Sequence, residues 1–331
     1  MTEITIGVDI SKEALDAYRF PDGESRRFAN AKKGHKALIA WIGENAARIV
    51  FEPTGPYHGA FEQTLAKAGL PLVKVNPRQA RRFAEATGKL AKTDRLDAAL
   101  LARMGALLKL DPRPALPGAI ASLKQIHLAR QALIKDRTAA KNRAKNLALA
   151  ILKRQNTERL NHIERQLAAV EAEIERRIAA DAALSRRFDI LISIPGLGRL
   201  TAFSLLIEMP ELGALEPGQA ASLAGLAPMA RQSGRWTGHA FIRGGRANVR
   251  QSLYMPALVA ARFNEDLKAK YDTLVAAGKP VKVAITAIMR KLLVLANALL
   301  KALRARPTSL ARRLCRLVSF QHSVFSQSAP K

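Results

Sequence analysis

Residues 3–9 have the sequence EITIGVD, which predicts a short strand that ends in the carboxylate of Asp9. Working outward, residues 16–20 and 25–29 flank a Pro-Asp-Gly turn and predict a hairpin. Residues 48–51 predict a buried strand that Glu52 follows directly. Further expected elements are helices over 34–46, 57–68, from Pro77 and over 94–108, and a strand over 70–75. Strands alternating with helices predict an α/β domain with a mixed sheet.

The chain beyond this domain has a different composition. Three prolines within residues 111–118 indicate a boundary. Residues 119–182 contain no Gly or Pro and predict a long helical pair or coiled-coil arm. We therefore expect four parts, which are an α/β domain at 1–113, a helical coiled-coil linker at 114–183, a mostly α domain at 184–305 with glycine-rich loops at 195–198 and 233–245, and a basic, mobile tail at 306–331.

The charge of the chain points to a polyanionic partner. The 331 residues include 54 Lys+Arg and 27 Asp+Glu, a net charge of +27. Nucleic acid is the first expected partner and a membrane surface a weak alternative, because the basic residues are not confined to one amphipathic helix. The single Cys315 excludes an internal disulfide and a cysteine zinc site. We expect a cytoplasmic protein without a signal peptide or membrane span.

Four carboxylates stand out in a chain that is poor in acid. Asp9 and Glu52 end two strands, and Asp94 and Asp97 share one face at the start of a helix. Carboxylate oxygens are the ligands that Mg²⁺ prefers, and paired ions can catalyse phosphodiester displacement. The alternative is that Asp94 and Asp97 only complement the helix dipole and that Asp9 is a turn residue. We interpret the set as catalytic and metal-binding, with Mg²⁺ or Mn²⁺.

The residues around these acids carry a resemblance. The segments GVDISK at 7–12, EPTGPY at 52–57 and KTDRLDA at 92–98 resemble the Asp-Glu-Asp-Asp transposases of bacterial insertion sequences, whose recombinase is guided by a bridge RNA. The resemblance covers about residues 3–300. It implies a RuvC-like, RNase H-like N-terminal domain, a C-terminal transposase domain, donor and target DNA, a noncoding guide RNA, and assembly as a tetramer or dimer of dimers.

A serine in the second half of the chain is a candidate nucleophile. Ser233 lies between glycines and arginines, and guanidinium groups stabilise charge that develops during phosphoryl transfer. By itself a loop serine next to glycine is usually a turn former. The resemblance to the family, through GLAP at 225–228, Ser233-Gly234 and RQSLY at 250–254, implies that Ser233 attacks the DNA and forms a phosphoserine link. We expect Ser222 and Ser252 to lie in helices and to be less exposed.

Other residues are expected to contact nucleic acid. The segment IPGLG at 194–198 resembles a helix-hairpin-helix motif, in which glycines allow close approach to a phosphate; a simple tight turn is the equal alternative. The first half of the arm, residues 130–154, carries eight Lys/Arg against Asp136 alone. Trp236 and Phe241 are expected to pack rather than to stack on bases. The expected nucleic-acid contacts are Pro195, Gly196, Gly198, Arg235, Arg243, Arg246, Arg250, Lys141, Arg143 and Lys145.

Two other functions compete with a transposase. A RuvC-like, structure-specific nuclease would use the same acids and metal with water as the nucleophile, and would form no covalent adduct. A nucleic-acid-binding protein with vestigial acids would bind tightly without cutting. Replacement of Ser233 by Ala separates the first of these from a serine recombinase, because strand cleavage by a water nucleophile would persist.

Overall fold

The computed structural model describes residues 3–53, 55–88, 94–113 and 118–305, with the side chains of 94–95 and 304–305 outside the description. The chain separates into two compact units, Met1–Pro117 and Gly118–Lys331. The finer division at residues 113, 183 and 305 stays a prediction. The expected tail at 306–331 lies outside the described residues, as do Thr54, Lys92 and Thr93 of the family segments.

The first unit is built on a five-stranded mixed sheet in the order β3-β2-β1-β4-β5. Strands β1 (Ile4–Ile10), β2 (Ala14–Phe20) and β3 (Ser25–Ala29) are antiparallel neighbours, whereas β4 (Ala46–Phe51) and β5 (Leu72–Lys74) run parallel to β1. The predicted mixed α/β fold is confirmed, and this sheet is consistent with an RNase H-like domain.

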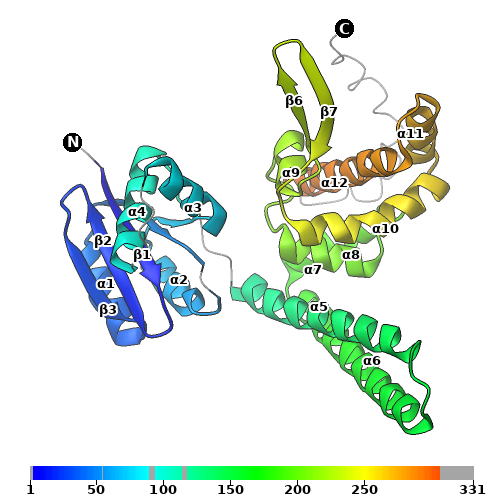
Figure 1. Ribbon diagram of the computed structural model, residues 1–331, viewed down its shortest axis with the longest axis horizontal. Coiled ribbons are helices and arrows are strands. Elements are labelled where there is room, and N and C mark those ends of the chain that lie inside the picture. Colours follow the sequence, from blue (N-terminus) through cyan, green and yellow to red (C-terminus); the bar gives the residue numbers. More distant parts are fainter. Residues whose placement is uncertain (1–2, 54, 89–93, 114–117, 306–331) are drawn as a thin grey trace. The chain divides into compact units, whose positions relative to one another are not determined.

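Helices cover both faces of this sheet (Figure 1). On one face, α1 (Lys32–Ile42) and α2 (His58–Lys67) pack on alternate residues of β1, such as Ile6 and Val8. On the other face lie α3 (Pro77–Ala86) and α4 (Asp94–Leu107), whose Leu101 packs with Val50. Helix α1 ends at Ile42, earlier than the expected Ala46, because Ala46 already begins β4.

Helix α4 lies unusually close to the first strand. A Cβ atom built on Gly7 would lie 2.0 Å from the carbonyl oxygen of Ala98 and 2.5 Å from the amide nitrogen of Ala102. A Cβ on Gly105 would lie 3.0 Å from Thr5, earlier in β1. Glycine is therefore needed at residue 7, and α4 runs antiparallel to β1, so that the first turn of α4 is next to the carboxyl end of β1.

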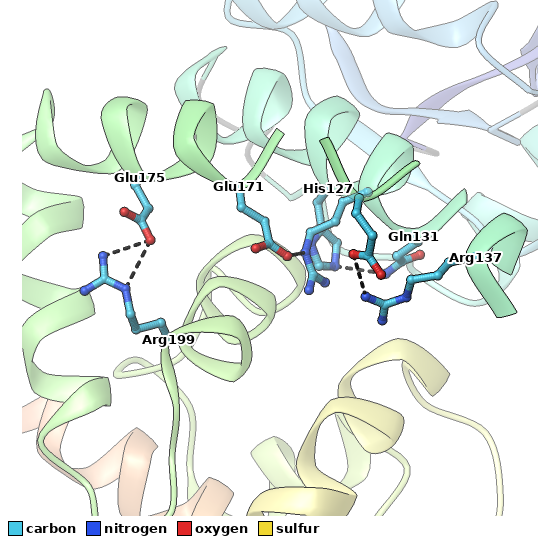
Figure 2. Close-up of polar contacts among 8 residues, drawn as sticks. His127, Gln131, Arg137, Glu171, Glu175 and Arg199 are labelled. Carbon is cyan, nitrogen blue, oxygen red and sulfur yellow. Dashed lines mark hydrogen bonds and ion pairs between the residues drawn. The ribbon is translucent and has the colours of Figure 1, made fainter. Parts of the chain in front are cut away.

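The second unit begins with two long helices, α5 (Gly118–Ala144) and α6 (Ala150–Ala179), which pack on each other as a helical hairpin. Figure 2 shows the ion pairs that tie them, with Arg137 3.3 Å from Glu164 and Arg130 2.7 Å from Glu171. The predicted long helical pair is present. The finer assignment as a coiled coil is not established by this packing.

The remainder of the second unit is mostly helical. It comprises α7 (Ala182–Ile192), α8 (Arg199–Glu208), α9 (Pro217–Leu223), α10 (Ala247–Phe263), α11 (Glu265–Ala276) and α12 (Val281–Ala305). Residues 281–303 of α12 are long and apolar enough to cross a membrane. However, half of this stretch is buried against the rest of the protein, and residues such as Ile288 and Leu292 are fully enclosed, as in a core helix.

One element differs from the sequence prediction. Most of residues 233–245 do not form a loop, because β6 (Pro228–Ser233) and β7 (Trp236–Ile242) form an antiparallel ribbon that projects from the helices (Figure 1). Gly234 has φ +56° and forms the turn with Arg235. The glycine-rich composition suggested a loop, but Gly234 serves a tight hairpin turn and Gly238 lies within β7.

Candidate functional site

The carboxylates Asp9 and Glu52 lie at one edge and on one face of the sheet. Val8 of β1 pairs with Phe51 of β4 in parallel register, and each acid follows directly. Gly7 and Val50, two residues before the acids, face α4 and α3. Because side chains alternate along a strand, Asp9 and Glu52 point toward the same helices. Both are half-buried.

Helix α4 brings the other two acids to this edge. Ala98 and Ala102 contact Gly7, and the first turn of α4 is next to the carboxyl end of β1. Asp97, which is half-buried, precedes Ala98 directly, and Asp94 begins the helix. The side chain of Asp94 lies outside the described residues. The fold thus assembles the backbone positions of all four predicted acids at one place, which we call the acid edge: Asp9, Glu52, Asp94 and Asp97.

The carboxylates of the acid edge are the kind of ligand that binds a divalent cation. Carboxylate oxygens are the ligands that Mg²⁺ and Mn²⁺ take. Among the side chains that the structure describes, which do not include that of Asp94, no group of three or more His, Cys, Asp or Glu lies close enough together to hold a metal. Asp9, Glu52 and Asp97 each have an interaction partner already.

A further acid, Asp16, lies beside Asp9. The two residues face each other directly in the β1–β2 register, where like charges destabilise a sheet. Arg27 of β3 lies opposite Asp16, with its Nε 3.9 Å from Oδ1. The arginine offsets part of the repulsion and leaves the sheet able to hold two carboxylates on neighbouring strands.

Two residues that the sequence analysis did not single out hold the acid-bearing loops together. Asn30 donates from Nδ2 to the carbonyl oxygens of Ser11 (2.8 Å) and Tyr57 (3.2 Å). Its Oδ1 lies 2.8 Å from Nε2 of His35, which is 2% exposed and packs edge-on against Phe61. Ser11 follows Asp9 and Tyr57 follows Glu52, so Asn30 connects the two loops that leave the acid edge.

Burial keeps His35 neutral in the folded protein. Desolvation lowers the pKa of its imidazole below the usual value of 6.5. Its Nδ1 is buried without a hydrogen-bond partner, so that a second proton there would be poorly solvated. A neutral ring that donates from Nε2 to Asn30 is the tautomer that this contact favours.

The IPGLG segment forms a tight turn between α7 and α8. Gly196 has φ +96° and packs against α10, where its Cβ position is 3.2 Å from Ala260. Packing therefore explains this glycine. Gly198 and Pro195 are exposed, and a Cβ on Gly198 would meet nothing within 4 Å. The predicted phosphate contact at Gly198 stays a prediction, and packing offers no competing reason for that glycine.

The predicted nucleophile Ser233 lies at the tip of the β6–β7 ribbon. It is exposed and pairs in register with Trp236 across the turn. The competing serines lie in helices as expected, Ser222 in α9 and Ser252 in α10. Ser222 is nevertheless exposed, contrary to expectation, because it lies on the outer side of its short helix next to the buried Ala221. Exposure alone therefore does not select Ser233.

The arginines near Ser233 separate into two groups. Arg246 makes a double ion pair with Glu211 (2.6 and 2.8 Å), and Arg250 donates to the carbonyl oxygen of Gly244 (2.9 Å). Both anchor the base of the ribbon. Arg235 and Arg243 are exposed, and no acid is paired with them in the described ranges. Arg235 and Arg243 are therefore better placed than Arg246 and Arg250 to bind a phosphate.

The predicted basic residues of the arm lie near its tip. Lys141, Arg143 and Lys145 are all exposed. Lys141 is 3.9 Å from Glu164, whereas no ion pair is found for Arg143 or Lys145 within the described part of the chain. Positive charge that is not neutralised internally is thus concentrated where α5 ends.

Two family models match this chain. The DEDD transposase model of the IS110 type matches residues 6–153, which include all four residues of the acid edge. The model of the transposase IS116/IS110/IS902 family matches residues 188–272, which include the ribbon and Ser233. These matches define a class of DNA-rearranging enzymes. The chain belongs to this transposase family.

Two curated relatives extend over nearly the whole chain. They are the pilin gene-inverting proteins of Moraxella bovis and Moraxella lacunata. Each is 29% identical over 315 residues, which cover 91% of this chain and 97% of the relative. The similarity thus spans both units and is not confined to one shared domain.

Proposed function

We propose that this transposase cuts and rejoins DNA strands through a phosphoserine intermediate at Ser233. The observation that carries the proposal is the placement of the predicted residues, with four acids at one edge of the sheet and an exposed serine at the tip of a basic ribbon. The two relatives are named for inverting a gene. Inversion of a segment requires that both cut ends be rejoined, which a covalent intermediate makes possible.

The chemistry conserves the number of phosphodiester bonds. Ser233 Oγ loses its proton and bonds to phosphorus, while the bond from phosphorus to the departing strand oxygen breaks and that oxygen takes up a proton. Attack by a strand hydroxyl reverses the step and frees the serine, so that no nucleotide cofactor is needed. Arg235 and Arg243 supply positive charge near the phosphate.

The acid edge would hold the divalent cation, Mg²⁺ or Mn²⁺. Asp9, Glu52, Asp94 and Asp97 are the residues that would bind it. When bound, the cation supplies Lewis-acid polarisation of the phosphodiester oxygens. Asn30 keeps the loops after Asp9 and Glu52 at a fixed distance from each other. Both units would then act on the same DNA strand.

The family resemblance implies several partners for this enzyme, which we propose as well. Donor and target DNA would be bound by the exposed basic residues of the ribbon and arm. A noncoding guide RNA would supply the choice of sequence and would be recognised through its shape and phosphates. The enzyme would work as a homo-oligomer, a tetramer or a dimer of dimers, in the bacterial cytoplasm.

A denaturing gel with end-labelled DNA tests the proposal. We expect a covalent protein–DNA adduct with the parent protein in Mg²⁺ and none with Ser233→Ala or Asp9→Ala. Ser222→Ala, which removes an exposed serine from the same unit, should retain the adduct. Cleavage at an unchanged rate by Ser233→Ala would contradict the serine mechanism and favour a RuvC-like nuclease that uses water.

A further inference from the structure

The β6–β7 ribbon presents two aromatic rings and an arginine to solvent. Trp236 is 56% exposed and Phe241 38% exposed. The guanidinium carbon of Arg231 lies 5.9 Å from the centre of the Trp236 ring and 5.7 Å from the centre of the Phe241 ring. In the strand register, Arg231 lies opposite Gly238, between the rows that hold Trp236 and Phe241, and all three residues are on one face. The expectation that these aromatic residues pack in a core was wrong, because neither strand has a buried residue.

The ring of Trp236 extends along its own strand as far as Gly238. A Cβ atom built on Gly238 would be 2.3 Å from the ring atom Cη2 and 2.9 Å from Cζ2 and Cζ3. Only glycine at residue 238 leaves room for this position of the ring. The six-membered end of the ring thus lies over the backbone of residue 238, while Trp236 as a whole remains 56% exposed. An indole in this position offers a flat platform, whereas an indole that stood upright would offer an edge.

The charge around the platform selects an anionic partner. No Asp or Glu occurs from residue 217 to 264, a stretch that contains six arginines. Arg231, Arg235 and Arg243 of the ribbon are exposed. Flat aromatic faces that alternate with guanidinium groups are the features that bind unpaired bases together with their phosphates.

We propose that Trp236, Arg231 and Phe241 form a stacking site for unpaired bases of a DNA strand. Each ring stacks on the face of one base. Arg231 lies between the two rings, where it binds the phosphate between the two bases or stacks on a base itself. The partner is DNA because the platform starts at Trp236, which pairs in register with Ser233. This inference rests on the proposed function, since it makes the stacked bases the neighbours of the phosphodiester that Ser233 attacks.

Intrinsic fluorescence provides a direct test with the full chain. The protein has two tryptophans, and Trp41 is buried in the N-terminal core with its Nε1 bonded to Glu24. A change in fluorescence when a DNA strand is added therefore reports on Trp236. We expect a thymidine oligonucleotide of about 10 nucleotides to quench the fluorescence, and a blunt duplex of equal length to quench it much less. Trp236→Phe should abolish the quenching while it retains most of the affinity.

Affinity measurements with matched variants complete the test. Trp236→Ala and Phe241→Ala should each weaken binding of the oligonucleotide roughly five- to hundred-fold. Gly238→Ala should weaken it as well, because the added Cβ displaces the ring without removing it. Phe263→Ala, which removes an aromatic ring that is 81% exposed on α10, should leave the affinity unchanged.

Three results would overturn the proposal. One is unchanged affinity in Trp236→Ala and Phe241→Ala. Another is tighter binding of a uridine oligonucleotide than of the thymidine one. The last is a change in the sedimentation of a double variant that combines Trp236→Ala and Phe241→Ala, with no change in oligonucleotide affinity, which would place the rings against a second copy. Loss of binding in Trp236→Ala together with no serine adduct in the parent would uphold the platform and refute the serine mechanism.

Discussion

At the scale of single residues, Asn30 holds more of the N-terminal unit together than its position on the chain suggests. Asn30→Ala removes two donated bonds and leaves Nε2 of the buried His35 without its acceptor. We expect the free energy of unfolding to fall by about 1–3 kcal/mol, measured by urea denaturation. Asn30→Asp keeps the acceptor for His35 but loses both donors, so an unaltered stability in Asn30→Asp would show that the loop contacts contribute nothing.

The buried His35 makes stability depend on pH. Its folded pKa is lowered by desolvation, so the unfolded chain takes up the proton first as the pH falls. The stability contributed by the neutral ring is complete above about pH 6.5 and decreases as the pH falls from there toward the folded pKa. We expect urea midpoints to drop between pH 7.5 and 5.5.

The matched variant for this prediction is His35→Gln, which cannot titrate. Its urea midpoint should change less over the same pH range. His127 of the second unit also has a pKa lowered by burial, so part of the dependence will remain in His35→Gln. An identical pH dependence in the parent and the variant would contradict the assignment to His35.

At the scale of elements, the contact between β1 and α4 determines where the acid edge forms. Gly7→Ala places a methyl group against the backbone of Ala98 and Ala102, which flexible side chains cannot relieve. We expect a loss of about 1–3 kcal/mol or more in stability, and a loss of DNA cleavage because Asp97 moves away from Asp9. Thermal unfolding and the cleavage assay measure the two effects.

Gly59 of α2 provides the control for this substitution. A Cβ at that position meets nothing within 4 Å, and alanine is a better helix former than glycine. Gly59→Ala should therefore leave stability unchanged or raise it by up to about 1 kcal/mol, with cleavage intact. Equal effects of Gly7→Ala and Gly59→Ala would contradict the role of the close contact.

These elements differ in how far the sequence predicted them. Periodic apolar residues and turn signals predicted the sheet, and the absence of Gly and Pro over residues 119–182 predicted the arm. The ribbon lacked such a pattern because both of its faces are exposed, and its glycines indicated a loop. Asn30 was missed because its partners, Ser11, His35 and Tyr57, converge only in the folded sheet.

At the scale of the whole molecule, the net charge of +27 predicts binding to nucleic acid that depends strongly on salt. Part of this charge is neutralised internally, as at Arg130 and Arg137 (Figure 2). The charge that remains available to bind nucleic acid is that of the basic residues without close acidic neighbours. At the tip of the arm, Arg143 and Lys145 have no ion pair within the described residues, and Lys141 has only a long one, 3.9 Å from Glu164.

Replacement of these three residues by Ala therefore tests whether the arm follows a phosphate backbone. We expect the slope of log affinity against log salt for duplex DNA to decrease by about 2–3, since each neutralised phosphate contributes about 0.9. The control is Arg176→Ala with Arg177→Ala. Both arginines donate to Glu173 and lower its pKa to about 2, so one of their two positive charges is already compensated. An equal decrease in both variants would mean that the slope reports total charge, and no decrease in the triple variant would remove the arm from the DNA-binding surface.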